Sequence, residues 1–167
     1  MSRRIILIAH NLRSTHNVGS LLRTAEGLGV EKVYLTGYTP YPLLPSDDRL
    51  PHISHKLARQ INKTALDAEL TQPWSHQEDV FECIAQLKAD GYSVAALEQT
   101  PTAVALPDYN PPAKLAIVLG REVEGVEADV LSACDLSLSI PMFGSKESFN
   151  VVQAAAMALF HVRFSVL

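Results

Sequence analysis

The sequence predicts an α/β fold in which helices cover both faces of a mostly parallel β-sheet. Two observations lead to this prediction. Short runs rich in Ile and Val alternate with segments whose apolar residues recur at the helical period, which is typical of strand–helix–strand units. The runs are almost continuously apolar, as expected for strands that are buried on both faces. We expect strands at residues 4–9, 32–36, 92–98, 114–119 and 136–140.

Three segments have the residue period of helices. Asn17 is a good N-cap for the first and Gly29 follows its end, whereas Ser75 with Glu78 forms a capping box for the second. The third, residues 151–164, is apolar all round, so it needs cover on both sides. It is either central or at a subunit interface, and we favour the interface. The apolar faces of the first two helices contain Val18, Leu21, Leu22, Ala25 and Leu28, and Val80, Phe81, Ile84 and Leu87.

Composition and charge narrow the class of protein. The 167 residues fit one domain, which we take as residues 1–167, and the 47% hydrophobic and 19% charged content is that of a globular protein. No apolar run approaches the ~20 residues that a membrane span requires, and two cysteines without an export signal argue against a disulfide framework, so we expect a cytoplasmic protein. Proteins that hold nucleic acid by charge alone are usually basic, whereas this chain has a net charge of −4. RNA binding therefore requires a local basic patch or a dimer that combines two patches, or it is weak.

A loop punctuated by prolines, residues 37–55, lies beside a modest basic stretch. The basic stretch has two interpretations, a solvated helix face or a surface that contacts RNA. The spacing of His52 and His55 does not predict a metal site, because no cysteine or acidic residue completes it. The basic residues are His52, His55, Lys56, Arg59 and Lys63.

Polar residues and glycines cluster directly after three of the predicted strands, at residues 10–23, 120–125 and 141–150. In open parallel sheets, ligands bind beyond the carboxyl ends of the strands, so these are candidate binding segments. None has the glycine pattern of a dinucleotide fold or a P-loop, and no nucleophile elbow is present. The residues alone predict an α/β domain with a polar site at the strand ends. They do not identify the ligand of that site.

Three ordered motifs lie in these segments. The first is Asn17-x-Gly19-Ser20-x-x-Arg23-x-Ala25-x-x-x-Gly29 and the second is Leu119-Gly120-x-Glu122-x-x-Gly125. The third is Ile140-Pro141-Met142-x-Gly144, followed by Ser148-x-Asn150-Val151 and an Ala-rich helix. In this order and spacing they resemble the motifs of the SpoU/TrmH family of RNA 2′-O-ribose methyltransferases, in the SPOUT superfamily.

The resemblance implies a C-terminal trefoil knot, a feature otherwise nearly absent from proteins. It also implies a homodimer whose sites are each completed by the partner chain, and S-adenosyl-L-methionine bound in the knot without a metal. The implied substrate is structured RNA, with tRNA favoured over rRNA. The alternatives are an enzyme of the same fold that methylates a base nitrogen or an rRNA, and a non-catalytic domain that binds the cofactor or RNA. The implied cofactor-binding residues are Leu119, Gly120, Glu122, Gly125, Ile140, Met142, Ser148 and Asn150, with Gly120, Gly125 and Gly144 allowing close approach of the main chain.

The resemblance also implies catalytic roles for Arg23, Asn17, Glu122, Ser148 and Asn150. Arg23 matches the family's arginine that is held close to the target ribose. Because a guanidinium is effectively never deprotonated in proteins, we expect Arg23 to bind phosphate and stabilise the developing alkoxide, with phosphate or water as proton acceptor. The other four match the polar residues that orient Arg23 and close the pocket. Asn150 is also placed to cap the last helix.

Overall fold

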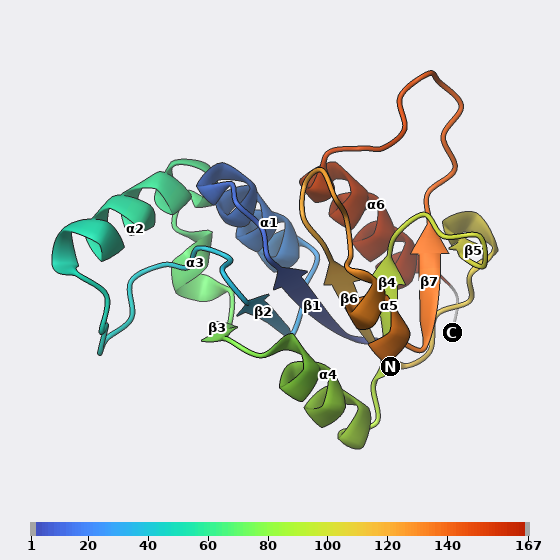
Figure 1. Ribbon diagram of the computed structural model, residues 1–167, viewed down its shortest axis with the longest axis horizontal. Helices are drawn as coiled ribbons and strands as arrows, with labels where there is room; N and C mark the ends of the chain where they lie inside the picture. Colours follow the sequence, from blue (N-terminus) through green and yellow to red (C-terminus); the bar gives the residue numbers. More distant parts are fainter. Residues whose placement is uncertain (1–2, 166–167) are drawn as a thin grey trace.

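A parallel β-sheet forms the centre of the molecule (Figure 1). The computed structural model describes residues 3–165. Within that range the sheet has seven strands in the order β3-β2-β1-β6-β4-β7-β5, and every neighbouring pair is parallel. The strands are β1 (Arg4–His10), β2 (Lys32–Thr36), β3 (Trp74–Gln77), β4 (Ser93–Leu97), β5 (Val104–Ala105), β6 (Lys114–Leu119) and β7 (Leu136–Ser139).

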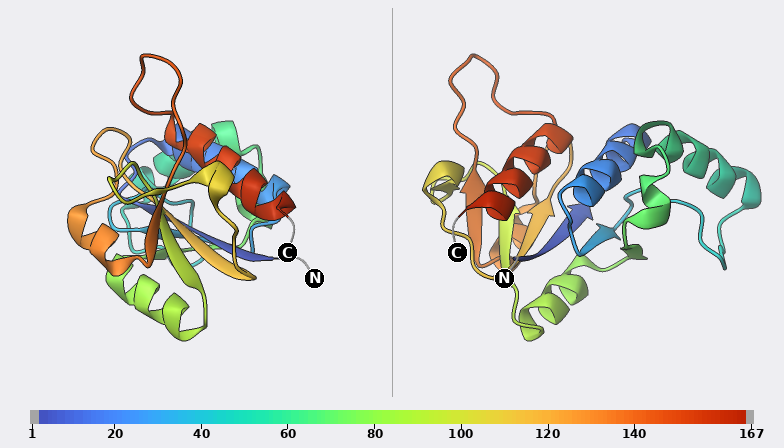
Figure 2. Two further views of the ribbon diagram at one scale, coloured as in Figure 1. Left: turned by 90° about the vertical axis from the view of Figure 1, so that its right-hand side faces the viewer. Right: turned by 180° about the vertical axis from the view of Figure 1, so that it is seen from behind.

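Helices cover both faces of the sheet, as predicted (Figure 2). On one face α1 and α6 lie side by side, and α2 and α3 lie on the far side of α1. On the other face α4 packs beside α5. None of the helices within residues 3–165 has both the length and the apolar character needed to cross a membrane. The helices are α1 (Thr15–Gly27), α2 (Pro51–Ala65), α3 (Ala68–Thr71), α4 (Val80–Ala89), α5 (Ala128–Ala133) and α6 (Val151–Phe164).

Strand β1 explains why its sequence is continuously apolar. Successive side chains of a strand point to opposite faces of the sheet. Ile5 and Leu7 belong to the core beneath α1 and α6, whereas Ile6 and Ile8 belong to the core beneath α4 and α5. The strand is therefore buried on both faces, as predicted.

The structure has two strands, β3 and β5, and two short helices, α3 and α5, that were not predicted, and α2 also differs from the prediction. Strand β3 has no apolar alternation and pairs with β2 alone at one edge of the sheet, and β5 contains only two residues at the other edge. Helix α2 begins at Pro51, so the proline-punctuated loop ends earlier than predicted. Strands β2 and β6 and helix α6 have the predicted bounds.

Both N-caps predicted for the first two helices were wrong. Ser14 caps α1, because its Oγ accepts the N–H of Asn17 at 3.2 Å. Asp79 caps α4, because its carboxylate accepts the N–H of Phe81 at 2.7 Å, and Ser75 lies in β3. In each case the cap lies two or three residues before the N–H that it satisfies, which is the geometry that capping requires.

Helices α1 and α2 cross at a glycine. A side chain at Gly19 would overlap the carbonyl oxygen of Ile61 and the hydroxyl of Thr64. The same hydroxyl donates a hydrogen bond of 2.8 Å to the carbonyl of His16. Gly19 thus lets the two backbones meet, and the hydrogen bond holds the C-terminal half of α2 against the start of α1.

Candidate active site

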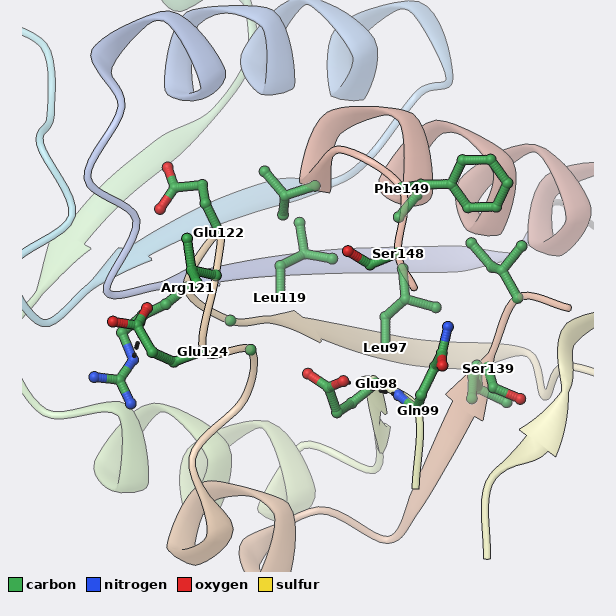
Figure 3. A pocket seen from close by; sticks show the side chains of 17 residues that line it. Leu97, Glu98, Gln99, Leu119, Arg121, Glu122, Glu124, Ser139, Ser148 and Phe149 are labelled. Atoms are coloured by element: carbon green, nitrogen blue, oxygen red, sulfur yellow. Dashed lines mark hydrogen bonds and ion pairs between the residues drawn. The ribbon is translucent and has the colours of Figure 1, made fainter. Parts of the chain in front are cut away.

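A pocket opens at the carboxyl ends of β4, β6 and β7 (Figure 3). Its volume is about 150 Å³. Leu97, Leu119 and Leu138 supply apolar walls, and the polar side chains of Glu98 and Ser148 also line it. Apolar walls with a few placed polar groups are typical of a small-molecule site.

One side of the pocket is a closed turn, residues 120–126. The N–H of Arg121 donates to the carbonyl of Gly125 at 3.0 Å, and the N–H of Gly125 donates to the carbonyl of Arg121 at 3.1 Å. Gly125 has a φ of +73°, and a side chain at Gly120 would overlap the main chain of Gly125. Both glycines are therefore required by the packing of the turn itself.

Glu122 ties this turn to the start of α1. Its carboxylate accepts the N–H groups of Arg13, at 3.1 Å, and of Ser14, at 3.0 Å, and the side-chain amide of Asn17 at 3.2 Å. Partial burial raises the pKa of Glu122, but these hydrogen bonds outweigh it and leave the pKa below its usual value. The carboxylate is thus held ionised at the N-terminus of a helix, where a negative charge is favoured.

Asn17 extends the connection to the third motif. The side-chain amide of Asn150 donates to Asn17 Oδ1 at 3.3 Å, while Asn150 Oδ1 accepts the N–H of Val152 at 2.9 Å. Asn150 therefore caps α6, as predicted. The resulting Glu122–Asn17–Asn150 network links the three motif segments, which lie far apart in the sequence.

The structure brings most of the predicted site residues together. Leu119, Gly120, Glu122, Gly125, Ile140 and Ser148 line the pocket.

Three further motif residues lie elsewhere. Arg23 is exposed on α1 and is not among the pocket-lining residues, and Met142 does not line the pocket either. Gly144 has no atom of the described chain within 4 Å of the place where a side chain would start, so the packing of the protein itself does not require a glycine there.

Glu98 and Gln99 were missed by the sequence prediction. The Glu98 carboxylate accepts the N–H of Val126 at 2.8 Å, and Gln99 Nε2 donates to the carbonyl of Glu147 at 2.9 Å. The end of β4 thus holds both the 120–126 turn and the segment after β7. They could have been found from the sequence, because Glu98 ends a predicted strand and Gln99 follows it, at the same place relative to the sheet as the other three segments.

Among residues 3–165, no group of three or more His, Cys, Asp or Glu side chains is arranged to hold a metal ion.

Comparison with known proteins identifies the family. The model of the SpoU rRNA Methylase family matches residues 4–160. The chain belongs to this family. The resemblance found in the motifs is thereby confirmed for nearly the whole chain.

Two named methyltransferases are similar in sequence to this SpoU-family chain. It is 27% identical over 162 residues to the tRNA (guanosine(18)-2′-O)-methyltransferase of Borreliella burgdorferi, covering 93% of this chain and 64% of that protein. It is 30% identical over 159 residues to the 23S rRNA (guanosine-2′-O-)-methyltransferase RlmB of Neisseria meningitidis, covering 95% of this chain and 58% of that protein. The chain therefore spans less than two thirds of the length of these relatives.

A solved structure has the same fold. The AdoMet-bound rRNA methyltransferase of Sinorhizobium meliloti superposes with a TM-score of 0.81 at 18% identity, covering 98% of this SpoU-family chain and 57% of that chain. At this level of identity the similarity establishes the fold alone.

Proposed function

We propose that this chain is an S-adenosyl-L-methionine-dependent methyltransferase that acts on a ribose 2′-hydroxyl of RNA. The observation that carries the proposal is the Glu122–Asn17–Asn150 network, which joins the three motif segments beside one pocket. The two named relatives are 2′-O-methyltransferases of tRNA and of rRNA, which supports the same reaction here.

The chemistry of the pocket fits an adenosyl group. Leu97, Leu119 and Leu138 offer apolar surface to an adenine ring, and Glu98 and Ser148 offer polar groups to the rest of the nucleoside. The S. meliloti neighbour is AdoMet-bound, which supports the choice of cofactor. When bound, S-adenosylmethionine would supply an electrophilic methyl group on a sulfonium sulfur, which leaves as a neutral thioether when the methyl group is transferred.

We assign to Arg23 the stabilisation of charge on the attacking oxygen. An arginine side chain has five N–H donors and no acceptor, so it does not serve as the proton acceptor. It can bind a phosphate of the RNA and stabilise the alkoxide that develops as the hydroxyl loses its proton to phosphate or water. Asn17, Glu122 and Asn150 position the pocket and the start of α1, the helix that carries Arg23.

We further propose a homodimer in which Arg23 completes the pocket of the partner subunit. Asn17 and Arg23 are separated by about 9 Å along α1, and Arg23 is exposed outside the pocket of its own chain. The neighbouring helix α6 exposes Phe160 and Phe164, whose side chains are 58% and 65% exposed and whose rings are 4.6 Å apart. Exposed apolar patches of this kind mark protein interfaces, which supports contact through α1 and α6.

The proposal also covers the RNA substrate, the location in the cell and the knotted fold. We favour tRNA over rRNA, and we place the reaction in the cytoplasm, with residues 1–167 acting as one domain. The family membership supports a trefoil knot formed by the segments around the pocket. The tie between the end of β4 and Glu147 is consistent with such close packing of distant segments.

Arg23→Ala tests the proposal directly. We expect the affinity for S-adenosylmethionine, measured by calorimetry, to change little, and methyl transfer to RNA to fall by about 10²–10³-fold because a charge-stabilising group is lost. Nucleoside analysis of the methylated RNA distinguishes a ribose product from a base product. Unchanged methyl transfer by the Arg23→Ala variant would contradict the role of Arg23, and a methylated base would contradict the proposed reaction.

A further inference from the structure

Helix α2 carries exposed basic side chains along its outer face. They recur at spacings of three and four residues, so they share one side of the helix, and the opposite side buries Ser54, Ile61 and Ala65. The line from the first to the last of them is about 16 Å long. We call these residues the α2 basic stripe: His52, His55, Lys56, Arg59 and Lys63.

In the part of the chain that the structure describes, no acidic side chain pairs with the formal charges of the stripe. Helix α2 contains no Asp or Glu. Within residues 3–165, Lys56, Arg59 and Lys63 form no ion pair with an acidic side chain, whereas several other cations do. Those pairs are Arg4–Glu31, Arg13–Glu124, Arg49–Asp47, Lys88–Asp135 and Arg121–Glu127. The stripe is thus a locally positive surface on a chain whose net charge is −4.

The stripe ends close to the helix that carries Arg23. Lys63 precedes Thr64, whose hydroxyl is bonded to the carbonyl of His16 on α1. Gly19 of α1 packs against the same part of α2, and Arg23 follows one helical turn later on the same side of α1. Because α1 packs against both α2 and α6, the helix that carries the stripe and the helix that carries Arg23 are neighbours on one face of the sheet (Figure 2).

We propose that the α2 basic stripe binds the phosphate backbone of the RNA substrate and guides it to Arg23. This rests on the proposed function. The formally charged residues of the stripe, from Lys56 to Lys63, span about 10 Å along α2. Successive phosphates of a nucleic-acid strand follow one another within a few ångströms, so these three cations can face several of them. The contacts are made to phosphate, so the stripe supplies affinity without reading the sequence.

The test compares Lys56→Gln/Arg59→Gln/Lys63→Gln with a control of equal charge change. The control is Ala85→Glu/Ala89→Glu/Ser132→Glu, three exposed positions on α4 and α5 on the opposite face of the sheet. The probe is bulk bacterial tRNA, with binding measured across a series of salt concentrations. We expect the stripe variant to raise the Kd by about 10-fold or more and to reduce the slope of log K against log salt by about 2–3. The control is expected to change the Kd by less than about 2-fold, because its added charges lie away from the stripe.

A second measurement separates this inference from the proposed function. Both variants are expected to bind S-adenosylmethionine like the unaltered protein in calorimetry, with the stripe variant raising the KM for tRNA more than it lowers kcat. A stripe variant with the Kd and salt slope of the control overturns the role of the stripe and leaves the proposed function standing. Failure of the unaltered protein to bind tRNA overturns the stripe, and failure to bind S-adenosylmethionine overturns the proposed function.

Discussion

The turn at residues 120–126 and the segment at residues 141–147 both follow strands of the sheet and both contain motif glycines, but they are held very differently. The turn is closed by two main-chain hydrogen bonds and is tied to α1 through Glu122. The segment projects from the body of the molecule, and its Phe143 is fully exposed (Figure 1). At Gly125 the backbone requires glycine, whereas Gly144 is surrounded by open space.

This contrast shows that a motif can combine residues with different physical roles. The turn is fixed by the fold, so its residues shape the pocket before anything binds. The segment is held mainly at its ends, through Glu147 and Asn150, so its middle is ordered by few contacts of its own chain. Substitutions in the turn should therefore affect stability, and substitutions in the middle of the segment should not.

The largest effect is expected for Gly120→Ala. The new methyl group overlaps the main chain of Gly125, so we expect the free energy of unfolding to fall by about 2–3 kcal/mol in urea titrations. Gly144→Ala is the matched control, and it should change the free energy of unfolding by less than about 0.5 kcal/mol. Equal losses of unfolding free energy in the two variants would contradict the proposed difference between the turn and the segment.

A smaller effect is expected for Glu122→Gln. The amide keeps the size of the side chain but loses the negative charge that strengthens the hydrogen bonds from the N–H groups of Arg13 and Ser14. We therefore expect the free energy of unfolding to fall by about 1–2 kcal/mol near neutral pH. The folded state lowers the pKa of this carboxyl, so its contribution is complete above the unfolded pKa of about 4.3 and disappears as the pH falls through the folded pKa. Urea titrations at several pH values should show the difference between the two proteins shrinking in acid. A difference that grows in acid would contradict the assigned ionisation.

The smallest of these effects is expected for Asn150→Ala. It removes the cap of α6 and the bond to Asn17, and a lost N-cap typically costs about 1 kcal/mol. Asn150→Asp keeps a capping oxygen but cannot donate to Asn17, so it separates the two contributions. We expect Asn150→Asp to recover most of the thermal stability and to bind S-adenosylmethionine more weakly than the unaltered protein. Full recovery of cofactor affinity would show that the link to Asn17 is not needed at the pocket.

The elements that were predicted correctly are those whose burial follows from the apolar pattern of their own residues. Strands β2 and β6 have a paired strand on each side and α6 packs one face into the core, so their apolar pattern matches their bounds. The edge strands β3 and β5 carry little of this signal, because one side of each remains unpaired. The caps failed for another reason: Asn17, Ser75 and Glu78 all suit a cap by residue type, and only the three-dimensional position of the free N–H groups decides which side chain is used.

The residues of the candidate site also divide into those that could be predicted from the sequence and those that could not. Residues such as Gly120, Glu122 and Ser148 could be predicted because an ordered motif carries them. Glu98 belongs to no motif and enters the site through strand order, which places the end of β4 between β6 and β7. The distance of Arg23 from the pocket could not be predicted either, because it depends on the crossing of α1 with its neighbours.

The order of the strands also constrains how the chain can fold during synthesis. Strand β1 lies between β2 and β6, and its partner on one side is made roughly a hundred residues later, a long-range pairing of the kind that slows folding. Until β6 leaves the ribosome, the nascent chain exposes an unpaired edge flanked by two apolar surfaces, a template for aggregation. We therefore expect a late, nearly complete collapse rather than stepwise folding from the N-terminus, and a need for protection of the growing chain by chaperones.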